Sequence, residues 1–277
     1  MYQNISKKSV LKQFNRRTNN IKNNFLYKEI SKRMIEKLRY IKILPKNILD
    51  AGCGNGNNYF LIKKNYPNSF YIGLDIGDYK INITRKNFFY SILHSIINFK
   101  NKKISKKRKF IKRDLSFTKI NSNTQDLIWS NLAIQWHPHP LIVFKEWYRI
   151  LKKNGLLMFS WIGSNSMLEI KKALYISKLK TSIPNFISME NCGNLLFEQK
   201  FLNIVVNRDY IDIAYKSSEK LLNDIRLLGG NPIKYRKQGL TSRDWCNRLI
   251  SCIESKKDTN GIIWLNLEIN YGHAWKF

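Results

Sequence analysis

Short apolar segments alternate with longer amphipathic ones along the first 160 residues of the chain. Five apolar segments predict buried strands, at residues 47–50, 70–75, 110–114, 126–130 and 155–160. Apolar residues at helical spacing predict helices at Leu11–Tyr40, around Tyr59, Phe60 and Ile62, and at Leu141–Leu151, with Gly155 just past the end of the last one. Apolar strands that alternate with helices form parallel sheets with helices on both faces. The pattern therefore predicts a doubly wound α/β fold.

The remainder of the chain has a different pattern. Helices are expected at 167–179, 185–200, 217–228 and 240–253, and alternating strands at 203–215 and 262–271. The two late strands would add an antiparallel edge to a mostly parallel, seven-stranded sheet. We divide the chain into a helical segment (1–40), a core (41–215), a helical cap (216–261) inserted between the last two strands, and the final strand (262–277). The cap would lie over the carboxyl ends of the strands, where such folds bind ligands.

The formal net charge of +30 changes this picture less than its size suggests. A large positive charge is typical of proteins that bind nucleic acid or acidic proteins. Here the excess is mostly lysine, is scattered along the chain, and accompanies abundant Asn and Ile, as an AT-rich genome favours. We favour this compositional explanation, and we interpret the densest basic run, Lys100–Lys109, as a solvated loop.

Other features of the composition point to a cytoplasmic protein. No run of about 18 apolar residues is present, so no membrane span is expected. The first residues lack the apolar core of a secretory signal. The four cysteines form no C-x-x-C pair and have no histidine cluster beside them, so we expect neither disulfides nor a metal site.

A glycine-rich turn carries the first candidate chemistry. Gly52, Gly54 and Gly56 alternate directly after the first strand, which ends at Asp50. Glycine tolerates positive φ and lets the backbone approach a ligand closely. Asp75 ends the second strand, where a carboxylate can accept from ribose hydroxyls, and Asp114 ends the third. The turn alone could be structural and each acid alone could be a helix cap, but together they favour a nucleoside-containing cofactor.

The segment from Asp50 to Gly56 resembles motif I of the class I S-adenosylmethionine (SAM)-dependent methyltransferases. The resemblance implies a Rossmann-like fold in which the glycine turn holds the amino-acid part of SAM and Asp50 lies near its ammonium group, usually through water. It also implies that Asp114 accepts a hydrogen bond from the adenine amino group. Further SAM contacts are expected from three residues that follow strand ends, Ile76, Leu115 and Asn131.

Two other parts of the chain narrow the family. Residues 126–136 resemble the D-L-x-W-S-N-L-A-x-Q-W signature of the malonyl-[acyl-carrier protein] O-methyltransferases of biotin synthesis. Residues 236–241 and 268–276 resemble carboxyl-terminal blocks of a bacterial branch of the same family, and the likeness runs from about Leu11 to the end. The family usually carries Tyr-Asp near the amino terminus, where this chain has Ile21-Lys22, with Tyr27 as a candidate substitute.

The resemblance implies transfer of a methyl group to the free carboxylate of malonyl-acyl carrier protein, an acidic protein partner. A carboxylate is already a nucleophile, so this reaction needs orientation but no general base. Candidate residues on the acceptor side follow the fourth strand: Asn131, Gln135, Trp136 and His137. We expect Gln135 to donate to the malonyl oxygen and Trp136 to form a pocket wall or part of the core.

Three polar residues in these segments also have a simpler interpretation, without a role in the reaction. We expect His137 to be a loop residue without a role, His273 to end the last strand, and Arg149 to be solvated or capping. The alternatives to malonyl-acyl carrier protein are a SAM-dependent methyltransferase acting on another small molecule or on RNA, and a non-methylating assembly factor on the same fold. Nucleic acid is disfavoured because the chain contains no N-P-P-Y-like motif and no RNA-binding module.

Overall fold

A computed structural model describes residues 4–15, 25–77, 108–179, 183–234 and 242–277, and it contains one seven-stranded sheet. The strands lie in the order β3-β2-β1-β4-β5-β7-β6. Their bounds are β1 (Asn47–Ala51), β2 (Phe70–Asp75), β3 (Arg108–Lys112), β4 (Gln125–Asn131), β5 (Leu151–Ile162), β6 (Leu202–Tyr215) and β7 (Ile263–Lys276). β1 to β5 pair in parallel, and β7 runs antiparallel between β5 and β6. The predicted doubly wound, mostly parallel sheet with an antiparallel edge is confirmed.

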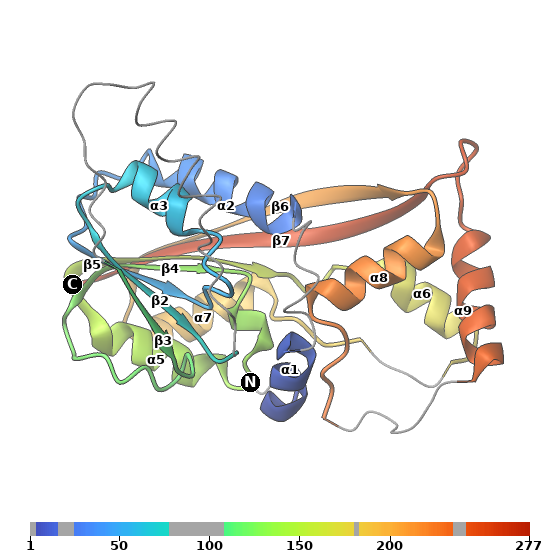
Figure 1. The fold of residues 1–277 in the computed structure, drawn as a ribbon, viewed down its shortest axis with the longest axis horizontal. Coiled ribbons are helices and arrows are strands. Elements are labelled where there is room, and N and C mark those ends of the chain that lie inside the picture. Colours follow the sequence, from blue (N-terminus) through green and yellow to red (C-terminus); the bar gives the residue numbers. More distant parts are fainter. Residues whose placement is uncertain (1–3, 16–24, 78–107, 180–182, 235–241) are drawn as a thin grey trace.

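Helices cover both faces of this sheet (Figure 1). α2 and α3 lie on one face and α5 and α7 on the other, while α6, α8 and α9 gather near the far end of the long β6–β7 pair. The helix bounds are α1 (Lys7–Asn15), α2 (Phe25–Leu38), α3 (Tyr59–Asn65), α5 (Pro140–Ile150), α6 (Leu168–Ile176), α7 (Met189–Glu198), α8 (Ser218–Leu228) and α9 (Arg243–Glu254). A short 3-10 helix, η2 (Ile134–Trp136), follows β4.

Local chemistry accounts for several of these boundaries. The hydroxyls of Ser188, Ser217 and Ser242 accept hydrogen bonds from first-turn N–H groups of α7, α8 and α9. The apolar face of α2, including Ile30 and Met34, is fully buried against the sheet. Burial of apolar area on both faces is what holds a parallel sheet of this kind together.

The amino-terminal segment differs from its prediction. The pattern predicts one helix from Leu11 to Tyr40, whereas the structure has two helices, α1 and α2, that lie apart in Figure 1. α2 packs on the sheet, but α1 follows a bridge between Ile5 and Ile233 of the cap. Helical spacing alone does not reveal that these residues form two helices, whose buried side chains nevertheless belong to one core cluster.

The end of α5 also differs from its prediction. The helix ends at Ile150, and Leu151 is already extended, so Gly155 is not the residue that ends the helix. β5 pairs Leu151 with Gln125 and then Leu156 with Leu127, which leaves residues 152–155 as a bulge in the strand. A Cβ atom at Gly155 would lie 2.8 Å from the Lys152 carbonyl oxygen, so the bulge itself requires glycine.

The last strand is longer than expected. The alternation predicts a strand that stops near Tyr271, but β7 continues to Lys276. His273 therefore does not end the strand, because it pairs with Met158 on one side and Val205 on the other. The Lys276 ammonium then donates to the carbonyl oxygens of Tyr148 and Leu151, at 2.8 and 2.9 Å, which ties the carboxyl end of the chain to α5 and β5.

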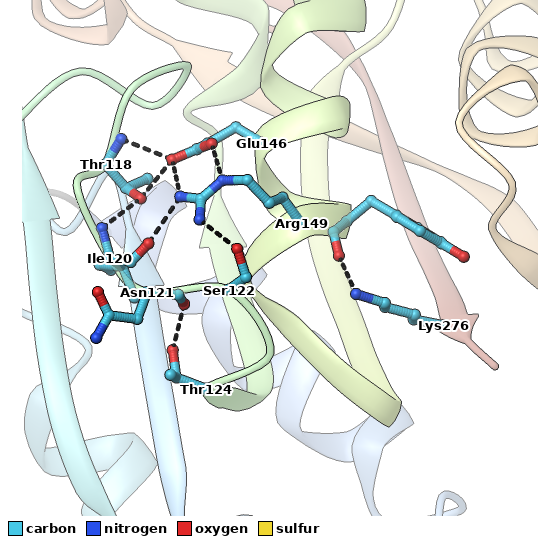
Figure 2. Close-up of polar contacts among 9 residues, drawn as sticks. Thr118, Ile120, Asn121, Ser122, Thr124, Glu146, Arg149 and Lys276 are labelled. Carbon is cyan, nitrogen blue, oxygen red and sulfur yellow. Dashed lines mark hydrogen bonds and ion pairs between the residues drawn. The ribbon is translucent and has the colours of Figure 1, made fainter.

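Arg149 joins a helix to a loop at the amino-terminal edge of the parallel strands (Figure 2). Its guanidinium donates to both carboxylate oxygens of Glu146, at 2.8 and 2.9 Å, and to the Ile120 carbonyl at 2.7 Å. Glu146 also accepts from the backbone and hydroxyl of Thr118, at 2.9 and 2.6 Å. Arg149 is thus neither simply solvated nor a helix cap, since it fastens the loop before β4 to α5.

Replacing Glu146 with Gln is expected to lower the free energy of unfolding at neutral pH by about 1–3 kcal/mol. Partial burial alone would raise the pKa of Glu146, but hydrogen bonds from Arg149 and Thr118 outweigh it and lower the pKa. A carboxyl with a lowered pKa stabilises the fold above its ordinary pKa and loses that contribution as the pH falls. Urea unfolding should therefore show the deficit shrinking in acid, with the exposed Glu198→Gln as a nearly neutral control.

Candidate functional site

A pocket opens at the carboxyl ends of the parallel strands, as the fold class predicts. Its walls come from the turns after β1, β2, β3 and β4, from α1 and α2, and from the end of α8. The lining residues are Lys7, Val10, Phe14, Tyr27, Gly52, Cys53, Gly54, Asn55, Asn57, Asn58, Asp75, Ile76, Asp114, Leu115, Asn131, Leu132, Ala133, Trp136, His137 and Leu227. The pocket thus brings together eight of the eleven predicted site residues: Gly52, Gly54, Asp75, Ile76, Asp114, Leu115, Asn131 and Trp136.

The glycine turn forms the floor of the pocket. Gly52 and Gly54 have φ values of 81° and 54°, in the left-handed region that favours glycine. A Cβ atom at Gly52 would lie 2.3 Å from the Ala133 side chain, whereas one at Gly54 would meet no protein atom within 4 Å. Gly56 is not among the lining residues, because it continues the turn and its N–H donates to the Cys53 carbonyl at 2.9 Å. The backbone at Gly54 therefore leaves space that a ligand can fill.

Asp75 links this turn to the second strand. Its Oδ2 atom accepts from the Gly54 N–H at 2.8 Å, and its Oδ1 atom accepts from the Gly77 N–H at 2.9 Å. Burial raises the pKa of Asp75, against the lowering effect of these backbone donors. Each carboxylate oxygen has a further lone pair, so the group can still accept from a pair of ribose hydroxyls.

Asp50 lies behind the turn and is not among the residues that line the pocket. Its side chain is fully buried, and its Oδ2 atom accepts from the Tyr71 hydroxyl at 2.6 Å. The Oδ1 atom has no hydrogen-bond partner among the described residues. The structure therefore places Asp50 outside the pocket lining, with its side chain fully buried.

The buried carboxyl of Asp50 should make the free energy of unfolding depend on pH. Burial raises its pKa to about 7, far above the ordinary value of 3.8. Between these values the folded protein binds a proton that the unfolded chain does not, so this group makes the fold less stable as the pH rises through that window. Asp50→Asn removes the titration, and its free energy of unfolding relative to wild type should rise from about pH 4 to pH 7 and then level off. Parallel pH profiles in urea unfolding would contradict this assignment.

Asp114 lies beyond the end of its strand. The pattern predicts a third strand at 110–114, but β3 covers Arg108–Lys112, and Asp114 follows in the turn that reaches the pocket. Its carboxylate forms an ion pair with Lys7 of α1 at 2.9 Å and contacts the His137 ring at 3.2 Å. His137 is buried and lines the pocket, so it is not an exposed loop side chain, and the expectation that it has no role stays a prediction.

Asn131 at the end of β4 fastens α2 over the pocket. Its amide nitrogen donates to the Tyr27 carbonyl and the Ser31 hydroxyl, at 2.9 and 2.7 Å. Its amide oxygen accepts from the Ser160 hydroxyl at 3.0 Å. Both amide hydrogens are therefore already used, and the side chain contributes to the wall of the pocket through its position.

Gln135 and Trp136 have different outcomes. Gln135 is fully buried and not among the lining residues, because its amide donates to the Leu132 carbonyl at 2.9 Å within the turn. The expected donation from Gln135 to an acceptor is therefore not available in this arrangement. Trp136 does form a wall, with edge contacts to Phe14 and Phe186 at 6.0 and 5.9 Å between ring centroids.

Tyr27 of α2 is the candidate substitute for the aromatic residue that the family carries near the amino terminus. It lines the pocket, and its hydroxyl donates to the Leu228 carbonyl at the end of α8, at 3.3 Å. The residues Ile21 and Lys22, which align with the usual Tyr-Asp pair, lie outside the described residues. Tyr27 therefore remains the candidate substitute, because it closes the gap between α2 and the cap.

Sequence reasoning missed the contribution of α1, whereas the cap was expected over this end of the sheet. Lys7, Val10 and Phe14 recur at helical spacing on one face of α1, and Leu227 comes from the last turn of α8. The spacing on α1 is visible in the sequence, but nothing local shows that this face covers a pocket rather than the core. Asn57 and Asn58 also line the pocket and were not predicted, although their position directly after the glycine turn could have indicated them.

The described part of the chain contains no group of three or more His, Cys, Asp or Glu side chains that could hold a metal ion. Among its helices, none combines the length and apolar character that crossing a membrane requires. The charged groups that line the pocket, Asp75, Asp114 and Lys7, fit a polar organic ligand with hydroxyl and amino groups at separate ends.

Comparisons with known proteins agree with this geometry. A sequence profile described as a methyltransferase domain matches residues 49–159. Among solved structures, the YcgJ protein from Bacillus subtilis has a TM-score of 0.57 at 13% identity, covering 90% of this chain and 98% of that one. Phosphoethanolamine N-methyltransferase 2 of Haemonchus contortus, solved with S-adenosylhomocysteine, has a TM-score of 0.54 at 16% identity, covering 96% and 60%. The fold and the profile define a class I SAM-dependent methyltransferase.

The curated relatives are more specific. A malonyl-[acyl-carrier protein] O-methyltransferase from Gallionella capsiferriformans is 30% identical over 254 residues, which cover 91% of this chain and 84% of the relative. One from Methylovorus sp. is also 30% identical, covering 91% and 82%. The chain belongs to the malonyl-[acyl-carrier protein] O-methyltransferase family.

Proposed function

We propose that this protein transfers a methyl group from SAM to the free carboxylate of malonyl-acyl carrier protein, giving the methyl ester that starts pimeloyl and biotin synthesis. The observation that carries the proposal is the likeness to relatives named for this reaction across 91% of the chain. The pocket supports it, because its lining combines a glycine turn, two carboxylates and an aromatic wall.

The cofactor end of the pocket would be held by residues of three turns. SAM, when bound, supplies a methyl group on a positively charged sulfur. Asp75 would accept from the ribose hydroxyls with Ile76 beside it, and Asp114 would accept from the adenine amino group with Leu115 against the ring. The glycine turn at Gly54 leaves the space for the amino-acid part. The cofactor roles of Asp50 and Asn131 would be indirect, through the turn and through α2.

The acceptor end is walled by Phe14, Tyr27, Trp136 and Leu227. A malonyl carboxylate entering there needs no proton removed, so orientation is the main requirement on the protein. A negative carboxylate and a positive sulfonium cancel their charges during the transfer. A wall of apolar side chains that excludes water therefore favours the transition state over the separated charges.

The cap supplies part of this wall and is anchored to the amino-terminal segment. Ile5 and Ile233 form an isolated bridge, and the Ser6 N–H donates to the Pro232 carbonyl at 3.0 Å. At the end of α8, a Cβ atom at Gly229 would lie 1.9 Å from the Trp136 ring, so the backbone there packs directly on the indole. This close contact holds α8 at the mouth of the pocket, where it would help to enclose the acceptor.

The carrier protein is expected to dock on a basic rim near the cap. The sequence suggests Lys234, Arg236 and Lys237, of which Arg236 and Lys237 lie outside the described residues. The densest basic segment, Lys100–Lys109, was expected to be a solvated loop. The structure describes only its last two residues, Arg108 and Lys109, and these lie in strand β3. Rim charges act mainly on the rate of association and are screened within about 8 Å at physiological salt.

Reversing Lys234, Arg236 and Lys237 to Glu is expected to slow methylation of malonyl-acyl carrier protein, most strongly at low salt. Reversal of Lys103, Lys106 and Lys107 is the matched control, since it makes the same change in net charge. The affinity for SAM should be unchanged in both variants. Equal losses would mean a diffuse effect of charge, and no loss in either would mean that the charge reflects composition alone.

The experiment that tests the function is incubation of the purified protein with methyl-labelled SAM and separate acceptors. Malonyl-acyl carrier protein is expected to gain label, and malonyl-coenzyme A and bulk RNA are the alternatives. Label on RNA alone would indicate a nucleic-acid methyltransferase. Cofactor binding without label on any acceptor would favour the non-methylating assembly factor.

A further inference from the structure

A buried imidazole contacts the carboxylate at the adenine end of the pocket. The Nε2 atom of His137 lies 3.2 Å from Asp114 Oδ1, and the side chain is 5% exposed. The Nδ1 atom of the same ring accepts a hydrogen bond from the backbone N–H of His139 at 3.1 Å. Because a backbone N–H can only donate, Nδ1 carries no proton, and the ring proton is on Nε2. His137 is therefore a donor aimed at Asp114 through its Nε2 N–H.

The donors around Asp114 are divided unequally between its two oxygens. Oδ1 accepts from His137, from the Ser116 N–H at 2.8 Å and from the Ser116 hydroxyl at 2.5 Å. Oδ2 is in contact with the Lys7 ammonium at 2.9 Å, from a side chain that is 42% exposed. Three donors fill the capacity of Oδ1, so a ligand can be accepted only at Oδ2.

The same contacts keep the carboxyl group ionised. Partial burial would raise the pKa of Asp114, but the hydrogen bonds from His137, Ser116 and Lys7 outweigh it and hold the pKa well below its usual range. An ionised carboxylate can only accept hydrogen bonds. The Oδ2 atom, which keeps a lone pair beside the Lys7 contact, therefore attracts an amino group and repels a carbonyl oxygen.

We propose that His137 is a positioning residue that makes the cofactor site selective for a 6-amino purine over a 6-oxo purine. Its N–H acts together with the two Ser116 donors on Oδ1 to fix the rotation of the carboxylate so that Oδ2 faces the base. An adenine amino group then finds an acceptor, whereas the carbonyl of hypoxanthine meets a second acceptor and loses the bond. The inference rests on the proposed binding of SAM in this pocket, and it adds a role for the residue that sets its selectivity.

The test compares the dissociation constants of S-adenosylhomocysteine and S-inosylhomocysteine, measured by calorimetry without turnover. Wild-type protein is expected to prefer the adenine compound by about ten- to a hundredfold, as loss of a hydrogen bond to a charged group implies. His137→Phe keeps the size of the ring but removes the donor, and its preference should fall to within about threefold. His137→Gln, which can place an N–H near Asp114, should restore much of the preference.

Controls separate positioning from a structural role. His139→Phe changes the neighbouring ring but keeps the backbone N–H that sets the His137 tautomer, so its preference should match wild type. If His137→Phe does not fold, His137→Asn provides a second variant whose side chain is too short to reach Asp114. Weaker binding of both compounds with an unchanged ratio would overturn the proposal, because it indicates structural support alone. A wild-type protein that does not discriminate would also overturn it, while label transfer to malonyl-acyl carrier protein would still stand as a separate result.

Discussion

Gly54→Val is expected to abolish measurable binding of S-adenosylhomocysteine, a loss of at least roughly a hundredfold in affinity. The reason is geometric, since a Cβ atom at Gly54 meets no protein atom within 4 Å and projects into open space. A branched side chain would fill the space that we assign to the cofactor. Calorimetry with the purified variant measures the loss directly.

Gly261→Val is the matched control for this substitution. Gly261 has φ of 72° and, like Gly54, has open space around its Cβ position, but it lies in the exposed turn before β7. Both variants therefore carry the strain of a branched residue in the left-handed region, about 1–2 kcal/mol. Their melting temperatures should fall by similar amounts, and Gly261→Val should bind the ligand normally. Normal binding by Gly54→Val would show that the turn has only a structural role.

Asp75→Ala is expected to weaken binding of the same ligand by about ten- to a hundredfold, the range for lost hydrogen bonds to a charged group. The variant loses the acceptor for the ribose hydroxyls and also frees the Gly54 N–H, which Asp75 now holds at 2.8 Å. Asp75→Asn keeps one acceptor oxygen, so its loss should be smaller. Calorimetry on the two variants separates the effect of shape from the effect of charge.

Asp244→Ala serves as the control for removal of a carboxylate. Asp244 is exposed on α9 and pairs with Arg248 at 3.1 Å, outside the pocket. Its loss changes the net charge by the same amount as Asp75→Ala and should leave affinity unchanged. If both Ala variants bind alike, Asp75 supports the turn without contacting the ribose.

The parallel part of the fold could be predicted from local pattern. β2 was expected at residues 70–75 and lies at Phe70–Asp75, because a short apolar segment between polar turns has few other solutions. The glycine turn was equally clear, since Gly52 and Gly54 stand at positions where the backbone takes positive φ. Both features depend on interactions between residues close in the sequence.

The orientation of the polar side chains at the site could not be predicted, because it depends on contacts that sequence spacing does not encode. Gln135 is polar and follows the end of a strand, as a binding residue would, but its side-chain amide donates to the Leu132 carbonyl. His137 looks like an ordinary loop residue, and its meaning comes from Asp114, which lies 23 positions earlier. Lys7 joins the same carboxylate from more than a hundred positions away. Which polar group faces a pocket is decided by competition among such partners, so a pattern can nominate residues but cannot orient them.

Mass spectrometry of the acceptor after reaction tests the central claim most directly. Malonyl-acyl carrier protein incubated with SAM and the wild-type protein is expected to gain one methyl group, located by fragmentation on the malonyl carboxyl. The reaction with Gly54→Val should leave the carrier unchanged, and an acetyl-acyl carrier protein, which has no free carboxylate, should remain unmodified with either protein. A methyl group on another part of the carrier, or an unmodified malonyl group with the wild-type protein saturated with SAM, would contradict the account.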